Sequence, residues 1–575
     1  MIFQSLISLY ERLDKVDEIP PFGFSVEDIG FVITIDKKGN LIGQPEDLRT
    51  KIKANTYEYF PSEVPYSNKV NVRSSGAAKV PNFMVDKADY IFGLSRSSEK
   101  KVHQEHFEKL IHKVCTDSSD EGVIAVKNFL KKWNSRNAAN LEAWKEICGN
   151  NGKWVAFRLQ GETGFIHERP AIKKLWSEYI DKKIYPEGFC FVDGRKHPLQ
   201  SQYAQFKFGS GASLVSFNEK AYESYGKKRG ENAPISVESE FKSAAALKHL
   251  LRTRKQRLRI GDATTVFWTE RESVVETFMG QILNPSPDSQ DAIPVQKFLE
   301  AVRAGKMPAE IEHEGDVKFY ILGLSLNKAR LSLRFWHVCS VGEMMGRLQK
   351  HFRDLEIERN PERDIEFPGI WQLLKETARE TKDISPLLGG ALTRAILAGA
   401  NYPQNLYQGV LGRIRADQAK KNPNTGKSIS NVNYLRASIL KAVLKRNHKK
   451  EVPMSLDPDR KDVAYLLGRL FAVLEKAQLD ALGKINATIK DRFFGSASAT
   501  PATVFPRLLR LAQHHIEKSE YGHVSDRRIA EIMEHVGLFP KHMGIEDQGL
   551  FAIAYYQQKN ALYKKKEAEN NKRGE

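Results

Sequence analysis

Short runs of β-branched and aromatic residues recur along the first 340 positions of the chain. The run FVITIDKKGNLI at 31–42 contains two apolar stretches separated by Gly-Asn, a pair that favours a tight turn, so it predicts two strands joined in a hairpin. These runs alternate with segments of helical character, which predicts an α+β portion built around a mixed or antiparallel sheet. Further strand-like runs stand at 153–159, 188–194, 212–218, 264–270 and 317–325.

The strand-like pattern stops near residue 341, and apolar residues then recur at intervals of three and four. In AYLLGRLFAVLEKAQ at 464–478 they fall on one face of a helix. Prolines divide this second half into helices of ordinary length, with VPMSLDP at 452–458 as an interior linker. The second half is therefore predicted to be all-α. The predicted domains are 1–340 (α+β), 341–453 (a helical connecting region) and 454–575 (a C-terminal helical bundle).

Lysine and arginine outnumber the acidic residues in a chain that has the composition of a folded protein. At 575 residues, with 41% hydrophobic residues, the chain is too long for a single core and should form at least two domains. The 89 basic residues against 71 acidic ones give a net charge of +18, which favours a polyanionic partner. A soluble basic protein without such a partner is the alternative that composition leaves open.

The four cysteines and the N-terminal sequence indicate the compartment. Because no C-x-x-C pair occurs, neither a disulfide framework nor a zinc ribbon is predicted. The N-terminus lacks a basic region followed by a cleavage site, and no apolar run reaches transmembrane length. We therefore expect a cytoplasmic protein with no membrane partner.

Sequence motifs for catalysis are nearly absent. The single GKS, at 426–428, has Lys421 where a nucleotide-binding loop requires glycine, so no ATPase activity is predicted. One pattern fits a metal-dependent nuclease, in which Asp288 and Asp316 would hold the metal and Lys318 would stabilise developing charge. Ordinary loop and strand charges explain these three residues better. We expect a protein that is not an enzyme and that uses no cofactor or metal, with the nuclease as the alternative.

Three segments combine basic and apolar residues at high density. Such residues neutralise phosphates and release counterions, which gives sequence-independent affinity for nucleic acid. For any one segment a solvated charged face is an equally good interpretation, but three of them on a chain of charge +18 favour contacts with a DNA backbone. The predicted contacts are Arg252, Arg254, Lys255, Arg257 and Arg259 in 247–261, Arg413 and Arg415 in 413–421, and Lys441 and Lys445 in 435–450.

Two loops are rich in glycine and serine, which expose backbone amides and let a ligand approach closely. Lysine and asparagine side chains of the first loop are suited to base edges and phosphates, whereas an ordinary hairpin explains the second loop almost as well. The residues predicted to read a short DNA motif are Lys69, Asn71, Arg73, Ser75, Gly76, Lys79 and Asn82 in the first loop and Gly209, Ser210, Gly211 and Ser213 in the second.

Long stretches of the chain resemble one known family. RIGDATTVFW at 259–268, LGLSLNKARLSLRFW at 322–336 and NATIKDRFFGSASATPATVFPRLL at 486–509 are similar to the Csd family, the large subunit of the type I-C CRISPR-associated surveillance complex (Cascade). The resemblance implies an RNA-guided antiviral complex whose large subunit recognises the protospacer-adjacent motif in duplex DNA, helps to open the duplex and stabilises the R-loop. It also implies that cleavage belongs to a separate helicase-nuclease, which the large subunit helps to recruit.

The same resemblance implies the partners of the chain. They are target double-stranded DNA and its displaced single strand, the CRISPR RNA, the backbone and small subunits of the complex, and the recruited helicase-nuclease. In type I-C systems the small subunit is typically a separate copy of the C-terminal part of the large subunit, made from an internal start. Met454 is the candidate start, because the residues after it are enough for a domain of ordinary size. A plain linker methionine is an equally good interpretation.

Overall fold

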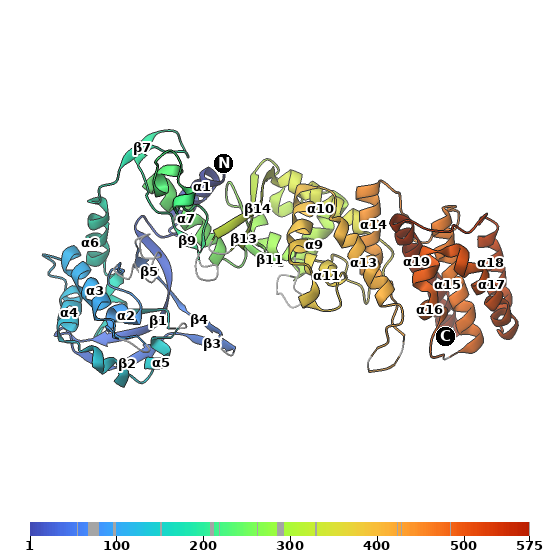
Figure 1. Ribbon diagram of the computed structural model, residues 1–575, viewed down its shortest axis with the longest axis horizontal. Helices are drawn as coiled ribbons and strands as arrows, with labels where there is room; N and C mark the ends of the chain where they lie inside the picture. Colours follow the sequence, from blue (N-terminus) through green and yellow to red (C-terminus); the bar gives the residue numbers. More distant parts are fainter. Residues whose placement is uncertain are drawn as a thin grey trace. The chain divides into compact units, whose positions relative to one another are not determined.

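A computed structural model describes residues 1–53, 56–66, 80–95, 99–149, 152–206, 212–217, 219–260, 263–283, 292–327, 330–422, 424–426, 428–483 and 485–573. The chain divides into two compact units, each with strands and helices of its own (Figure 1). Unit 1 contains Met1–Arg252 and Leu326–Ser332, and unit 2 contains Thr253–Ser325 and Leu333–Glu575.

The central strand of unit 1 is β1 (Phe24–Ile35), whose sequence is rich in β-branched and aromatic residues. It pairs antiparallel with β5 (Phe60–Pro65) over its first half and with β2 (Leu41–Asp47) over its second half, and parallel with β6 (Trp154–Leu159). Gly39, at φ +80°, lies in the turn between β1 and β2, in agreement with the predicted hairpin. Residues of β1 enter two separate hydrophobic cores, so both faces of this sheet are covered.

Helices complete unit 1. Three of them, α3 (Lys101–Val114), α4 (Glu121–Lys132) and α6 (Pro170–Asp181), bury their apolar stripes in the larger of the two cores. Two others, α1 (Ile2–Asp14) and α7 (Val237–Arg252), pack along each other. The short elements are α2 (Ala88–Ile91), α5 (Trp144–Ile147), β3 (Thr50–Lys53), β4 (Thr56–Glu58), β7 (Glu187–Phe189), β8 (Lys196–Pro198), β9 (Gln205–Phe206) and β10 (Ala212–Ser213).

Unit 2 begins with a sheet in which β12 lies between β11 and β13 and pairs antiparallel with both. Phe267 and Phe319 on one face of this sheet enter the core of the unit together with residues of α8, α9 and α10. Residues 326–332 belong to unit 1, where Arg330 pairs with Ser213 of β10. The elements are β11 (Arg257–Ile260), β12 (Ala263–Thr269), α8 (Val275–Leu283), α9 (Ala292–Ala304), β13 (Lys318–Asn327), β14 (Arg330–Ser340) and α10 (Val341–Leu355).

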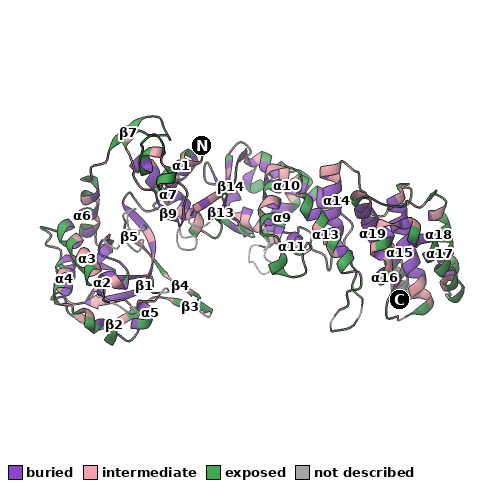
Figure 2. Ribbon diagram, viewed as in Figure 1, coloured by how far each residue is buried: buried purple, intermediate pink, exposed green. Residues whose placement is uncertain are grey.

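The described residues after α10 contain helices and no named strand, which confirms the predicted all-α portion. Its central helix, α15, is buried on nearly every side (Figure 2) and crosses α19 closely. A Cβ atom on Gly468 of α15 would lie 2.2 Å from the carbonyl oxygen of Phe551, so the crossing requires glycine. The helices are α11 (Ile370–Lys375), α12 (Pro386–Ala398), α13 (Gln404–Ala416), α14 (Tyr434–His448), α15 (Val463–Leu482), α16 (Ile489–Ala499), α17 (Pro501–Lys518), α18 (Gly522–Met533) and α19 (Ile545–Arg573).

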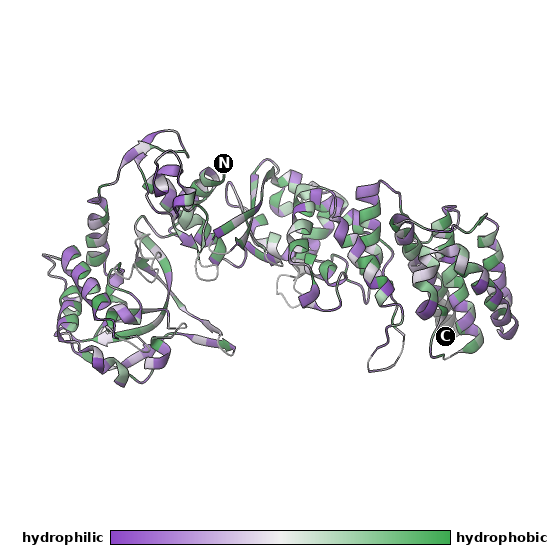
Figure 3. Ribbon diagram, in the orientation of Figure 1, coloured by the Kyte–Doolittle hydropathy of each residue, from purple (hydrophilic) through white to green (hydrophobic). Residues whose placement is uncertain are grey.

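One hydrophobic core runs through unit 2, from Leu258 in β11 to Leu562 in α19. Apolar side chains of successive helices supply it, and hydrophobic and hydrophilic residues are interspersed along the helices of this unit (Figure 3). The predicted boundaries at 340 and 453 both fall inside this unit, so the predicted domains do not coincide with the compact units. The predicted fold class, α+β followed by an all-α portion, is confirmed. Among the described helices, none is long and apolar enough to cross a bilayer.

Candidate nucleic-acid interface

The basic residues at 254–259 lie on and just before β11, the first strand of the unit 2 sheet. Strand alternation turns Arg257 and Arg259 toward solvent and Gln256 inward. Gln256 fixes the strand from the inside, because its Nε2 donates a hydrogen bond of 2.8 Å to Glu276. We call four residues the β11 basic edge: Arg254, Lys255, Arg257 and Arg259.

The positive charges of the β11 basic edge lie close enough to disfavour one another. Burial lowers the pKa of Arg257, and the charges of Arg254 and Arg259 lower that pKa further. Arg254, Lys255 and Arg259 are exposed, and none of them pairs with a carboxylate among the described residues. A fold that holds cations together against their mutual repulsion gains stability when a polyanion binds. This edge is therefore suited to a phosphate backbone.

Arg252, the first residue of the predicted cluster, has a different environment. It ends α7 in unit 1, donates a hydrogen bond of 2.6 Å to the carbonyl of Val26, and pairs with Asp28 at 3.2 Å. Some of the N–H groups of the Arg252 guanidinium are therefore already bound to acceptors on β1. Its contact with DNA stays a prediction.

The predicted contacts on α13 are tied to neighbouring side chains. Arg413 pairs with Asp417, and Asp417 also accepts a hydrogen bond of 2.7 Å from Arg436. Burial alone would raise the pKa of Asp417, but the hydrogen bonds from the two arginines lower it below its usual value. Arg415 donates to Gln548 of α19. These ties stabilise helix packing, and DNA binding by Arg413 and Arg415 stays a prediction.

The two lysines predicted on α14 differ in exposure. Lys441 is 4% exposed and donates to the carbonyl of Glu356. Burial lowers its pKa to about 8, and the neighbouring charge of Lys445 acts in the same direction. The side chain of Lys445 is 37% exposed and lies 3.9 Å from Asp354, which forms a shorter pair of 2.7 Å with Arg446. In this structure Lys441 is an interior residue, and Lys445 is the one of the two that presents charge to solvent.

The two small-residue loops lie mostly outside the described residues. Asn82 is buried, where its backbone N–H donates to Asp86 at 2.7 Å and its Nδ2 donates to the carbonyl of Val85 at 3.1 Å. Ser213 is also buried and pairs within the sheet. Neither side chain is therefore exposed to a base edge. The predicted residues that lie outside the described ones are Lys69, Asn71, Arg73, Ser75, Gly76, Lys79, Gly209, Ser210 and Gly211.

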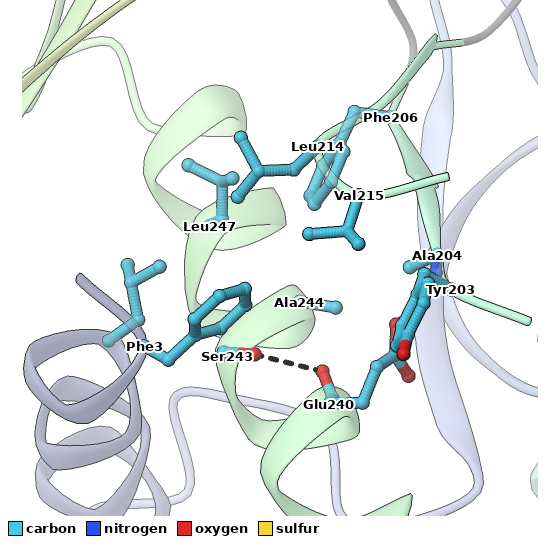
Figure 4. Close-up of a pocket in the computed structure, with 11 residues that line it drawn as sticks. Phe3, Tyr203, Ala204, Phe206, Leu214, Val215, Glu240, Ser243, Ala244 and Leu247 are labelled. Carbon is cyan, nitrogen blue, oxygen red and sulfur yellow. Dashed lines mark hydrogen bonds between the residues drawn. The ribbon is translucent and has the colours of Figure 1, made fainter. Parts of the chain in front are cut away.

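A small apolar cavity lies beneath the two ends of the second loop, between α1, α7 and β9 (Figure 4). Phe206 and Leu214, on either side of the loop, line it. Glu240 of α7 accepts a hydrogen bond of 2.6 Å from the backbone N–H of Ala204, which fixes the approach to β9. The cavity has a volume of about 20 Å³, which leaves room for about one water and for no larger ligand.

The nuclease pattern is only partly visible. Asp288 lies outside the described residues, Asp316 is exposed, and Lys318 pairs with Glu270 at 3.0 Å. The hydrogen bond and the charge of Glu270 raise the pKa of Lys318. Across the part of the chain that the structure describes, no three histidine, cysteine or acidic side chains gather as metal ligands would.

A second basic surface, on α17, was missed from the sequence. Four exposed residues follow the helical spacing of three and four, and none pairs with a carboxylate in the described ranges. Arg507 also lies 5.4 Å from the ring centre of Phe493. The periodicity of basic residues, rather than their local density, would have found this surface. The four residues are Arg507, Arg510, His514 and Lys518.

Comparison with known proteins gives one match over nearly the whole chain. The family model described as CRISPR-associated protein (Cas_Csd1) matches residues 6–563. No curated protein matches the chain. The match includes both units and every segment on which the resemblance to type I-C large subunits was based. The chain therefore belongs to the CRISPR-associated Csd1 family.

Proposed function

We propose that this protein is the large subunit of a type I-C RNA-guided complex that recognises a protospacer-adjacent motif in duplex DNA. In this role it helps to open the duplex and stabilises the R-loop. Family membership supports the assignment to a CRISPR-associated assembly. Guide pairing reads most of the sequence in such systems, and strand exchange is nearly balanced in free energy, so modest contacts between protein and backbone are enough to favour opening.

The β11 basic edge is the observation that carries this proposal. Its arginines and lysine are clustered on an edge strand, and three of the four make no ion pair with a described residue. Burial lowers the pKa of Arg257 most, and phosphates would relieve the repulsion from Arg254 and Arg259 that lowers it further. Because these contacts are made to backbone, we expect them to strengthen binding to all sequences alike.

The other roles of the subunit follow from the family rather than from single residues. We propose a cytoplasmic protein that contacts the CRISPR RNA within the assembled complex, docks on backbone and small subunits, and helps to recruit a separate helicase-nuclease. The segment from Met454 onward would also be made as a separate small subunit. The loop at 69–82, without its buried Asn82, remains the proposed reader of the flanking motif.

We propose that the chain itself has no catalytic activity. The second candidate function is a metal-dependent nuclease built on Asp288, Asp316 and Lys318. Among the described residues no group of three potential metal ligands gathers, around Asp316 or elsewhere, and this does not favour the nuclease. The exposed pair of Lys318 with Glu270 is weak and does not decide between the two functions.

A gel-shift titration of the assembled complex tests the proposed DNA contact. Arg257→Gln with Arg259→Gln should weaken binding to target and non-target duplexes equally, and should reduce the salt slope of log K by about one per lost contact. The control is Lys37→Gln with Lys382→Gln, which removes the same charge from two exposed lysines that already pair with carboxylates. An unchanged salt slope in the arginine variant would remove the β11 basic edge from the DNA path.

A further inference from the structure

Two phenylalanines of unit 1 are displayed to solvent by the β7–β8 hairpin. Phe189, the last residue of β7, is 68% exposed, and Phe191, in the turn that follows, is 69% exposed. Cys190 between them is 1% exposed, so the two rings lie on the outer side and the thiol on the inner side. The hairpin is one of the exposed parts of unit 1 (Figure 2). Large exposed apolar groups in a small area usually mark a binding surface.

The inner side of this hairpin is firmly anchored. Cys190 packs in a small core, and its N–H donates a hydrogen bond of 2.8 Å to the carbonyl of Arg195. The N–H of Phe191 donates to the carbonyl of Pro234 at 2.8 Å. A Cβ atom on Gly188 would lie 2.6 Å from the end of the Leu199 side chain, so this glycine leaves room for Leu199 to pack against β7. The exposed rings therefore stand on an ordered backbone.

The sequence around the two rings matches part of a known pattern for binding unpaired bases. Strands that stack nucleobases carry the pattern K/R-G-F/Y-G/A-F-V-x-F/Y, in which aromatic residues two positions apart share one face. Gly188, Phe189, Phe191 and Val192 fit that pattern, including its two central aromatic positions. Glu187, Cys190 and Gly194 stand where the pattern has a basic residue, a glycine or alanine, and a last aromatic residue. The supporting fold differs, because β7 and β8 form a sheet of two strands.

Cations stand beside the aromatic pair. Lys196 lies directly opposite Phe189 in the strand register and hence on the same face. It pairs with Glu187 at 3.0 Å, and both side chains are more than 60% exposed, so a phosphate can compete for the lysine. Arg195 is also exposed and pairs with no carboxylate among the described residues. This arrangement places positive charge next to two ring faces.

We propose that the β7–β8 hairpin binds single-stranded nucleic acid, with two successive bases stacked on Phe189 and Phe191 and the backbone near Arg195 and Lys196. Residues two apart are separated by at most about 6.6 Å where the chain is extended, and Phe191 lies just past the end of β7. Stacked bases in a duplex are separated by about 3.4 Å, so only an unstacked strand can offer one base to each ring. The site is separate from the β11 basic edge and does not depend on it.

The test compares two double variants of the full chain. Phe189→Leu with Phe191→Leu keeps an apolar surface but removes both ring faces, whereas Phe189→Tyr with Phe191→Tyr keeps the rings. The probe is a fluorescein-labelled oligothymidylate, titrated by anisotropy alone and as a duplex with oligoadenylate. Each lost stack should weaken single-strand binding by about 5- to 150-fold. The tyrosine variant should bind as the wild type does, and the duplex should bind all three proteins equally.

One result would overturn the proposal, namely a leucine variant that binds the single strand as tightly as wild type. If Phe189→Asp with Phe191→Asp then also fails to assemble with the other subunits, the hairpin is a protein-docking surface instead. Duplex binding by the Arg257 and Arg259 variants is measured in the same titrations. The proposal for the β11 basic edge and the proposal for the β7–β8 hairpin can therefore fail independently.

Discussion

Replacing Lys441 with methionine tests whether this lysine is an interior residue or a DNA contact. In the structure Lys441 of α14 is buried, and its ammonium group donates to the carbonyl of Glu356. Burial lowers the pKa of Lys441 from 10.5 to about 8. Methionine has a similar length and carries no charge. We therefore expect Lys441→Met to leave DNA binding unchanged and to alter the pH dependence of stability.

The magnitude follows from the difference between the two pKa values of Lys441. The folded protein releases the proton near pH 8, whereas the unfolded chain holds it up to pH 10.5. Between these values the unfolded chain binds more protons, so this lysine makes the wild type more stable as pH rises. The 2.5-unit difference corresponds to about 3 kcal/mol. Below pH 8 the buried charge of Lys441 lowers the free energy of unfolding of the wild type by this full amount, and the methionine variant carries no such charge.

Urea unfolding at pH 7 and at pH 10 measures this effect. At pH 7 the variant should be more stable by about 1–2 kcal/mol, because the loss of the hydrogen bond to Glu356 offsets part of the gain. At pH 10 that advantage should disappear or reverse. Lys382→Met, which removes an exposed lysine outside α14, is the control and should show no gain in stability at pH 7. Equal stability differences at both pH values, or weaker DNA binding by Lys441→Met alone, would refute the reasoning.

Three further predictions concern the loop, the chemistry and the internal start. Asn71→Ala should reduce the preference of the assembled complex for the cognate flanking motif, which a competition gel shift measures. Asn82→Ala should leave that preference unchanged and should lower the free energy of unfolding by about 1–3 kcal/mol, because Asn82 is buried and bonds to the nearby backbone. Urea unfolding measures this second effect. The purified chain should not cut DNA in the presence of Mg²⁺ or Mn²⁺, and cutting that Asp316→Ala abolishes would contradict this. Met454→Leu should abolish a short C-terminal copy of the chain, which an immunoblot against the C-terminus detects, and an undiminished copy would show that Met454 is not its start.

The fold class was predictable because the periodicity of apolar residues changes near residue 341. The strand runs at 264–270 and 317–325 became β12 and β13, and the run at 464–478 became part of α15. The extent of the units was not predictable, since it depends on long-range packing. The core that joins Leu258 to Leu562 contains residues from strands and helices that no local pattern relates.

The exposure of the candidate residues follows from local geometry only in part. Alternation along β11 places Arg257 and Arg259 on the face opposite the buried Leu258. Lys441 is buried although it lies in a dense basic segment, because α14 is covered on most sides. The exposed cations of α17, by contrast, follow a helical spacing that a search for dense basic runs overlooks.

The shared core of unit 2 has a consequence for proteolysis. The linker at 452–458 contains partly exposed positions, including Met454 at 53%. Around it, however, the N–H of Glu358 donates to the Met454 carbonyl at 2.7 Å, and Tyr556 of α19 donates to the carbonyl of Glu358 at 2.8 Å. Contacts between α14 and α19 add to these bonds. A protease that cuts the linker would therefore leave two fragments that stay associated and co-elute as one particle.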